Sequence, residues 1–285
     1  MGTKVYLNGR IVEMGEAAVP VSNPALLHGV GLFETVRAYG GRPFRLGRHV
    51  HRMLASAERL NMSIGQVSEQ VPAAVRQVLE ANRLGEARVR FTVTPPAPQE
   101  PDAGPNLLVM AQELAGYPDG LYERGMTVYV CDQYRQSVQD PLAGHKTTSY
   151  FPRLLVLRNA QDRACGEGLW FTPENLLAEG CMSNVFLIKD GCLATPPLNT
   201  PVLPGVTRAA ILELAGQEGI PAEESPRTIR DLLEADEVFL TNAIMEVMPV
   251  TRVERKAIAG ERPGPLTQRL ARGYRELVLS TAADS

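Results

Sequence analysis

The chain has 285 residues and a formal net charge of −3, with 44% hydrophobic and 21% charged residues. This length predicts about two domains, and the composition excludes wholesale disorder. Without a basic excess, we expect neither a nucleic acid nor a membrane surface as a partner. The four cysteines form no CxxC pattern, so neither a metal site nor a disulfide framework is expected. No apolar run approaches the ~18 residues of a membrane span, and the first residues lack the apolar core of a secretion signal, which indicates a cytoplasmic protein.

The first half of the chain combines short strand patterns with helix patterns. Asn8-Gly9 between two apolar stretches predicts a hairpin, and a second hairpin arm is expected over residues 31–39. Apolar residues at helical spacing predict helices over residues 48–60 and 68–82. Further strands are expected over residues 89–94 and 107–112, joined by a long proline-rich loop of the kind that is often functional.

The second half begins after residues 116–125, a turn-rich segment that predicts a boundary between domains at 1–117 and 122–285. Both halves mix strands and helices without strict alternation, which predicts an α+β or α/β fold. Neither the glycine-rich Rossmann fingerprint nor the P-loop pattern occurs in the sequence. In this half we expect strands over residues 126–130, 169–172, 184–188, 238–241 and 247–253, and helices over residues 152–163, 207–218, 228–235 and 265–279.

An ordered set of motifs begins at Glu179. The sequence reads E-G-C-M-S-N-V-F over residues 179–186, L-A-T over 193–195 and L-P-G-V-T-R over 203–208. The last motif places a glycine turn directly before a helix pattern. A helix N-terminus presents unpaired backbone N–H groups and the positive end of the helix dipole, so it binds phosphate readily. Taken alone, this motif would fit an ordinary capped loop equally well.

Together these motifs resemble the signature of the class IV aminotransferases, which are fold-type IV pyridoxal-phosphate enzymes. That family includes branched-chain aminotransferases, D-amino-acid aminotransferases and 4-amino-4-deoxychorismate lyases. The resemblance implies a two-domain fold similar to D-amino-acid aminotransferase, with the cofactor lysine in the second domain. It extends over nearly the whole chain through H-G-V-G-L-F-E-T-V-R at residues 28–37, H-V-H-R at 49–52, G-H-K-T-T at 144–148 and L-T-N-A-I at 240–244.

The resemblance implies pyridoxal 5'-phosphate as cofactor, bound through a Schiff base to Lys146. The chain has only four lysines, and Lys146 is the only one in a plausible site context. A lysine amine must be unprotonated to attack, so its pKa should be lowered by burial or a nearby cation. By the same resemblance, Glu179 faces the pyridine nitrogen. Arg52 holds the phosphate, since its fork donates two bonds to one phosphate.

The residues that we expect in the site fall into three groups. Lys146 and Thr35 are assigned to catalysis. The cofactor-binding residues are Lys146, Glu179, Arg52, Val206, Thr207, Asn242, Ala243 and Tyr150. The substrate-binding residues are Phe33, Arg37, Arg90 and Ile244. Without the motifs, Lys146 would be an exposed loop lysine, Arg52 part of a charged helix face and Tyr150 a core residue.

The member of the family is less sharply indicated. Thr35 and Asn242-Ala243 resemble the lyases, whereas the loop at residues 94–105 lacks the arginine that lyases and D-amino-acid enzymes usually place there. The Tyr-x-Arg of the branched-chain enzymes is also missing. The anchor of the substrate carboxylate therefore stays open among Arg90, Arg37, Arg153 and the backbone N–H groups of Ala243 and Ile244.

Three functions are compatible with this pattern. We expect an aminotransferase that moves an amino group between an amino acid and a 2-oxo acid. The first alternative is a 4-amino-4-deoxychorismate lyase, which releases pyruvate and 4-aminobenzoate, and the second is an inactive binding protein that keeps the fold. The resemblance also implies a homodimer with the site near the subunit interface.

Overall fold

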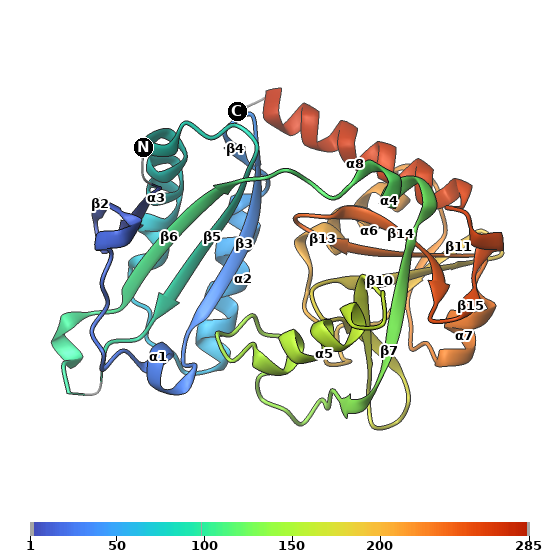
Figure 1. The fold of residues 1–285 in the computed structure, drawn as a ribbon, viewed down its shortest axis with the longest axis horizontal. Coiled ribbons are helices and arrows are strands. Elements are labelled where there is room, and N and C mark those ends of the chain that lie inside the picture. Colours follow the sequence, from blue (N-terminus) through green and yellow to red (C-terminus); the bar gives the residue numbers. More distant parts are fainter. Residues whose placement is uncertain (1–2, 98, 284–285) are drawn as a thin grey trace. The chain divides into compact units, whose positions relative to one another are not determined.

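The computed structural model of the protein describes residues 3–97 and 99–283 (Figure 1). The chain forms two compact units. Unit 1 extends to Ala115 and includes His145–Tyr150 and the residues from Ser280, and unit 2 comprises Gly116–Gly144 and Phe151–Leu279. The segment with Lys146 therefore belongs to unit 1, whereas the sequence placed this lysine in the second domain. Backbone pairing is the reason, because Phe33 N–H donates to the carbonyl of Lys146 at 2.9 Å and Thr148 N–H to that of Gly31 at 2.8 Å.

Unit 1 contains a six-stranded antiparallel sheet in the order β2-β1-β6-β5-β3-β4. The predicted hairpin at Asn8-Gly9 is confirmed, with φ values of 47° and 91°. The strands are β1 (Lys4–Leu7), β2 (Arg10–Glu13), β3 (Leu32–Tyr39), β4 (Arg42–Pro43), β5 (Ala87–Thr94) and β6 (Asn106–Glu113), and the helices are α1 (Pro24–His28), α2 (Leu46–Arg59) and α3 (Val67–Asn82), with short 3-10 turns η1 (Met14–Glu16) and η2 (Pro101–Ala103).

The two faces of strand β3 have different roles. Leu32, Val36 and Ala38 pack with α2 and α3 in one apolar core. Because successive side chains of a strand point to opposite faces, Phe33 and Thr35 lie on the other face of the sheet. The predicted site residues of β3 thus lie on the face opposite the helices.

Unit 2 contains a nine-stranded mixed sheet in the order β12-β11-β10-β13-β14-β7-β8-β9, with β15 beside β14. β7 lies parallel to both β8 and β14, and β11 lies parallel to β12. The strands are β7 (Met126–Arg135), β8 (Glu167–Phe171), β9 (Leu177–Gly180), β10 (Asn184–Lys189), β11 (Cys192–Thr195), β12 (Ala222–Glu224), β13 (Glu237–Asn242), β14 (Glu246–Val253) and β15 (Lys256–Ala257), and the helices are α4 (Asp119–Arg124), α5 (Phe151–Gln161), α6 (Val206–Gln217), α7 (Ile229–Glu234) and α8 (Pro265–Ala283), with one 3-10 turn, η3 (Ala259–Glu261).

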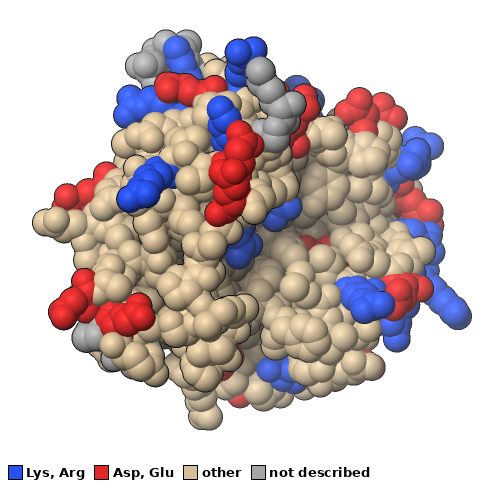
Figure 2. Space-filling view, turned by 60° about the vertical axis from the view of Figure 1, so that its left-hand side comes forward, with Lys and Arg blue, Asp and Glu red and all other residues tan. Residues whose placement is uncertain are grey.

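The surface agrees with the near-neutral composition. On the face that Figure 2 shows, basic and acidic side chains are interspersed, with uncharged surface between them. Within residues 3–97 and 99–283, no helix combines the length and the apolar character needed to cross a membrane.

Candidate active site

Lys146 lies in a cluster of aromatic and basic side chains in unit 1. Its Nζ is 4.4 Å from the ring centroid of Phe33 and 5.3 Å from that of Tyr150. The two rings meet edge to face at 5.2 Å, and the Arg90 guanidinium carbon lies 3.6 Å from the Phe33 centroid. Phe33, Arg90 and the Lys146–Tyr150 segment are thus brought together, so the face of the sheet opposite α2 and α3 carries a lysine and an arginine around one buried ring.

The glycines of the motif at residues 28–37 allow the Lys146 segment to approach closely. Gly29 has a φ of 70°, and a Cβ there would lie 2.6 Å from the Ser149 hydroxyl. A Cβ on Gly31 would lie 3.0 Å from the Thr148 hydroxyl. Instead, the Thr148 hydroxyl donates to the carbonyl of Gly29 at 2.6 Å. The two glycines of the motif therefore allow the segment at residues 28–37 to pack closely against the segment that carries Lys146.

Arg90 occupies an electropositive part of this cluster. It lies opposite Thr35 in the register of β5 and β3, and its Nε is 3.4 Å from the Thr92 hydroxyl. Burial lowers the pKa of the Arg90 guanidinium, and the charge of Arg88 adds to this effect. Arginine stays protonated at neutral pH in spite of this shift, so Arg90 offers a fixed forked charge for a carboxylate.

Arg52 has a partner that the sequence did not predict. Its Nε and Nη2 donate to the two carboxylate oxygens of Glu34 at 2.7 and 2.6 Å. The Nδ1 atom of His49 lies 2.8 Å from the same carboxylate. Burial lowers the pKa of His49, and the charge of Lys146 acts in the same direction, whereas Glu34 raises it. The H-V-H-R motif thus forms a buried cluster with β3 on the helix side of the sheet.

Arg37 lies in a different environment from Arg90. It forms an ion pair with Glu86 at 3.4 Å, and its guanidinium carbon is 4.5 Å from the ring centroid of Tyr39. Glu86 is half exposed in this pair. Among the candidate anchors of a substrate carboxylate, Arg90 therefore has the more favourable surroundings.

Glu179 is the centre of a second cluster, which lies in unit 2. Its side chain is 2% exposed, and its Oε1 accepts from Arg153 Nη2 at 2.5 Å. Its Oε2 accepts from the backbone N–H of Leu203 at 2.8 Å, with Asn184 Nδ2 at 3.5 Å. The predicted carboxylate is thus buried and held at both oxygens.

The N-terminus of helix α6 lies close to Asn184. Gly205 is the N-cap, and a Cβ there would lie 2.0 Å from Asn184 Oδ1. Val206 and Thr207 follow as the first helical residues, and both are buried. Gly205 carries no side-chain oxygen that could cap the helix. The first backbone N–H groups of α6 therefore need an acceptor from elsewhere, and a phosphate would suit them.

Asn242 organises the turn that the resemblance assigned to cofactor and substrate. Its Oδ1 accepts from the backbone N–H groups of Ile244 and Met245, both at 2.8 Å, and its Nδ2 donates to the carbonyl of Met182 at 3.1 Å. The N–H of Ile244 is thus bonded within the turn. This bond weakens the prediction that Ala243 and Ile244 together bind a carboxylate through their N–H groups.

Glu167 is a functional candidate that the sequence analysis missed. Its carboxylate is 1% exposed, and burial raises its pKa. It accepts from the backbone N–H groups of Cys181 and Met182 and from the Ser183 hydroxyl, at 3.1 to 3.2 Å. It therefore holds the turn between Glu179 and Asn184. A glutamate at the first position of the otherwise apolar strand β8 was the available signal.

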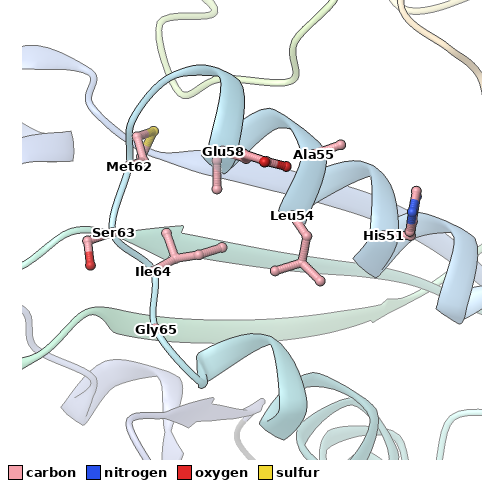
Figure 3. Close-up of a pocket in the computed structure, with 9 residues that line it drawn as sticks. His51, Leu54, Ala55, Glu58, Met62, Ser63, Ile64 and Gly65 are labelled. Atoms are coloured by element: carbon pink, nitrogen blue, oxygen red, sulfur yellow. The ribbon is translucent and has the colours of Figure 1, made fainter.

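A separate cavity lies in unit 1, between the second half of α2 and the segment that leads to α3 (Figure 3). Its volume is about 430 Å³. His51 of the H-V-H-R motif lines it, whereas His49 and Arg52 face the sheet. None of the residues assigned to the site lines this cavity.

Comparison with known proteins decides the family. A family model described as amino-transferase class IV matches residues 31–253. The chain belongs to the class IV aminotransferases. It is 31% identical over 290 residues to the branched-chain-amino-acid aminotransferase of Escherichia coli K12, covering 95% of this chain and 91% of the relative. It is 28% identical over 287 residues to the D-alanine aminotransferase of Bacillus licheniformis, covering 98% and 99%.

A solved structure supports the same assignment. The branched-chain aminotransferase of the thermophilic archaeon Thermoproteus uzoniensis, solved with norvaline, matches at a TM-score of 0.90 and 29% identity, covering 98% of this chain and 96% of that chain. The fold-type IV fold, the family and the aminotransferase assignment predicted from the motifs are therefore confirmed. The relatives named here are aminotransferases, which favours the first of the three expected functions over the lyase and the inactive protein.

Proposed function

We propose that this class IV aminotransferase uses pyridoxal 5'-phosphate, bound covalently to Lys146, to move an amino group between an amino acid and a 2-oxo acid. The observation that carries this proposal is the arrangement of Lys146 Nζ beside Phe33, with Arg90 against the same ring. The reaction needs an amine that binds the cofactor and a cation that binds the carboxylate of the amino acid, and Lys146 and Arg90 are residues of these two kinds.

The residues of the chain fit the cofactor. The glycine-capped N-terminus of α6 presents the N–H groups of Val206 and Thr207, which suit a phosphate. The buried Glu179 carboxylate suits a protonated ring nitrogen. Pyridoxal phosphate, when bound, supplies the electron sink for the bond that breaks at the substrate Cα.

The remaining roles follow from the side chains. Lys146 Nζ would accept the proton that leaves the substrate Cα and would pass it on to the cofactor carbon that keeps the amino group. Arg90 binds the substrate carboxylate, and Phe33 and Tyr150 exclude water from the lysine. Arg52 is oriented by Glu34 and contributes positive charge for the phosphate.

The assembly in this proposal is a homodimer. Val21 is 82% exposed, and Leu26 and Leu27, a few residues further along the chain, are also exposed. Exposed apolar side chains that gather on one surface mark interaction sites in soluble proteins. We expect a second copy of this chain to cover them. Sedimentation of a fully active monomer would rule this assembly out.

Half-reactions with single amino acids test the function. The wild-type protein loaded with pyridoxal phosphate should show a visible absorption band that one class of amino acid, D or L, converts to the pyridoxamine form. Borohydride reduction followed by peptide mapping should find the cofactor on Lys146. The K146A variant should give neither result, whereas K189A, at an exposed lysine paired with Asp236, should behave as wild type. A protein without a band, or a band that no amino acid changes, would contradict the proposal.

A further inference from the structure

Arg153 binds the segment that carries Glu179 at three points. Its Nη2 donates to Glu179 Oε1 at 2.5 Å, and its Nη1 is 3.2 Å from the carbonyls of both Gly180 and Cys181. One guanidinium therefore holds the carboxylate and the backbone directly after it. Arg153 was one of the open candidates for the substrate carboxylate, and this geometry assigns it to Glu179 instead.

The position of Arg153 on its helix does not favour a basic residue. It lies in the first turn of α5, where the positive end of the helix dipole repels a cation. Its side chain is 19% exposed, so solvent screens this repulsion only in part. The ion pair with Glu179 is the contact that compensates for this placement.

Glu179 needs a counter-ion because it is almost fully buried. Moving an ionised carboxylate out of water is costly unless a cation and hydrogen bonds accompany it. In the part of the chain that the structure describes, Arg153 is the basic side chain in ion-pair contact with this carboxylate. The N–H of Leu203 then holds the second oxygen, so the carboxylate has one orientation.

We propose that Arg153 is a positioning residue. It is the counter-ion that orients Glu179 toward the cofactor ring nitrogen and balances part of the negative charge of this carboxylate. This inference rests on the proposed function, because it assigns Glu179 to the ring nitrogen. Because the Glu179 carboxylate also pairs with Arg153, it attracts the proton of the ring nitrogen less strongly than an unpaired buried carboxylate does. The pair thus sets how much positive charge the cofactor ring carries.

A double-mutant cycle in the protein without cofactor tests the pair itself. Trp170 is the only tryptophan of the chain, and the Arg153 guanidinium carbon lies 5.8 Å from its ring centroid, so its fluorescence reports unfolding of unit 2. R153Q should lower the folding equilibrium constant about tenfold or more in the Glu179 background, but less than about threefold in the E179Q background. R158Q, at an exposed arginine of the same helix, should have little effect in either background. Equal losses in both backgrounds would overturn the counter-ion role.

The nitrogen-15 NMR shift of ring-labelled pyridoxal phosphate tests the effect on the cofactor. In R153Q the ring signal should move toward the protonated position, and in R153K it should move the same way by a smaller amount, whereas R158Q should stay near wild type. An unchanged ring signal in a less stable R153Q protein would mean that Arg153 is only structural. If R153Q does not fold, a ring signal displaced in R153K still distinguishes the two cases, because lysine keeps the charge but loses the fork. If wild type binds no cofactor, the proposed function fails, while the cycle still decides whether Arg153 and Glu179 are coupled.

Discussion

Arg52 and Glu34 form a buried bidentate ion pair, with Nε and Nη2 at 2.7 and 2.6 Å from the two carboxylate oxygens. Arg52 is on α2 and Glu34 is on the face of β3 that meets this helix. A forked pair of this kind fixes the plane of the guanidinium as well as its distance. The acidic residue of the F-E-T-V-R motif therefore orients the arginine that we assign to the phosphate.

The Glu34 pair should make the fold acid-sensitive. Burial alone would raise the pKa of Glu34, but the Arg52 charge and the hydrogen bonds from His49 and Arg52 lower it from 4.5 to about 2. A carboxyl whose pKa is lower in the folded state stabilises the protein above its unfolded pKa and loses this effect as the pH falls. We expect about 3 kcal/mol of stabilisation to disappear between pH 4.5 and about 2.

Urea unfolding of wild type and E34Q across this range, followed by circular dichroism, provides the measurement. The difference in unfolding free energy between the two proteins should be constant near neutral pH and should shrink below pH 4.5. A difference that does not change with pH would show that Glu34 is not ionised in the folded protein.

Arg90 should determine the affinity for the substrate carboxylate. Loss of a hydrogen-bonded charge partner costs about 1.5–3 kcal/mol, so R90A should lower kcat/KM for an amino acid by about ten- to a hundredfold. R90K should recover part of this loss, because lysine keeps the charge but not the fork. R88A, at an exposed residue of the same strand, is the matched control and should remain near wild type.

A second substrate separates this role from a general loss of structure. It is the amine that corresponds to the same amino acid without its carboxylate. If Arg90 binds the carboxylate, R90A should lose activity toward the amino acid and keep its low activity toward the amine. Equal losses for both substrates would assign Arg90 to packing against Phe33.

Glu167 should have a pH dependence of opposite sign to that of Glu34. Burial raises its pKa, so its contribution to stability is fully present below the unfolded value of 4.5 and decreases as the pH rises through the folded value. E167Q presents one acceptor oxygen where the carboxylate presents two, so we expect it to cost about 1–3 kcal/mol and to weaken cofactor binding. E174Q, at an exposed glutamate of unit 2, is the control. Cofactor affinity that is unchanged in E167Q would contradict the role of Glu167 in holding the turn at residues 180–183.

Local patterns predicted the local structure. The hairpin at Asn8-Gly9 was predicted because two adjacent residues determine its turn, and the helices of the second half follow from periodicity within one segment. Strand β9 was missed because its four residues are too few for alternation to show. The short helix α1 was missed although Asn23 caps it, with Oδ1 accepting from the N–H of Ala25 at 2.9 Å.

Contacts between distant segments could not be predicted in this way. The pairing of the Lys146 segment with β3, the ion pair of Arg153 and Glu179, and the contacts of Glu167 join residues whose spacing carries no periodic signal. The family resemblance named Lys146 and Glu179, but Arg153 was considered only as a candidate for the substrate carboxylate and not as a partner of Glu179. Such partners become visible only when the fold brings the segments together.

Gly205 should tolerate a methyl group poorly. A Cβ there would lie 2.0 Å from Asn184 Oδ1, and Asn184 cannot easily move, since it is buried and its Nδ2 donates to the carbonyl of Leu203 at 2.9 Å. G205A should therefore displace the N-terminus of α6 and raise the Kd for pyridoxal phosphate by about tenfold or more, because the helix N–H groups would no longer face the phosphate.

Gly216 in the same helix is the matched control for this change. A Cβ there would meet no atom within 4 Å, so G216A should change stability by less than about 1 kcal/mol, in the stabilising direction, because alanine loses less conformational freedom than glycine in a helix. Titration of both variants with pyridoxal phosphate, followed by visible absorption, gives the comparison. If G205A binds the cofactor as tightly as G216A, the phosphate is not held at the N-terminus of α6, and Arg52 becomes the principal residue for it.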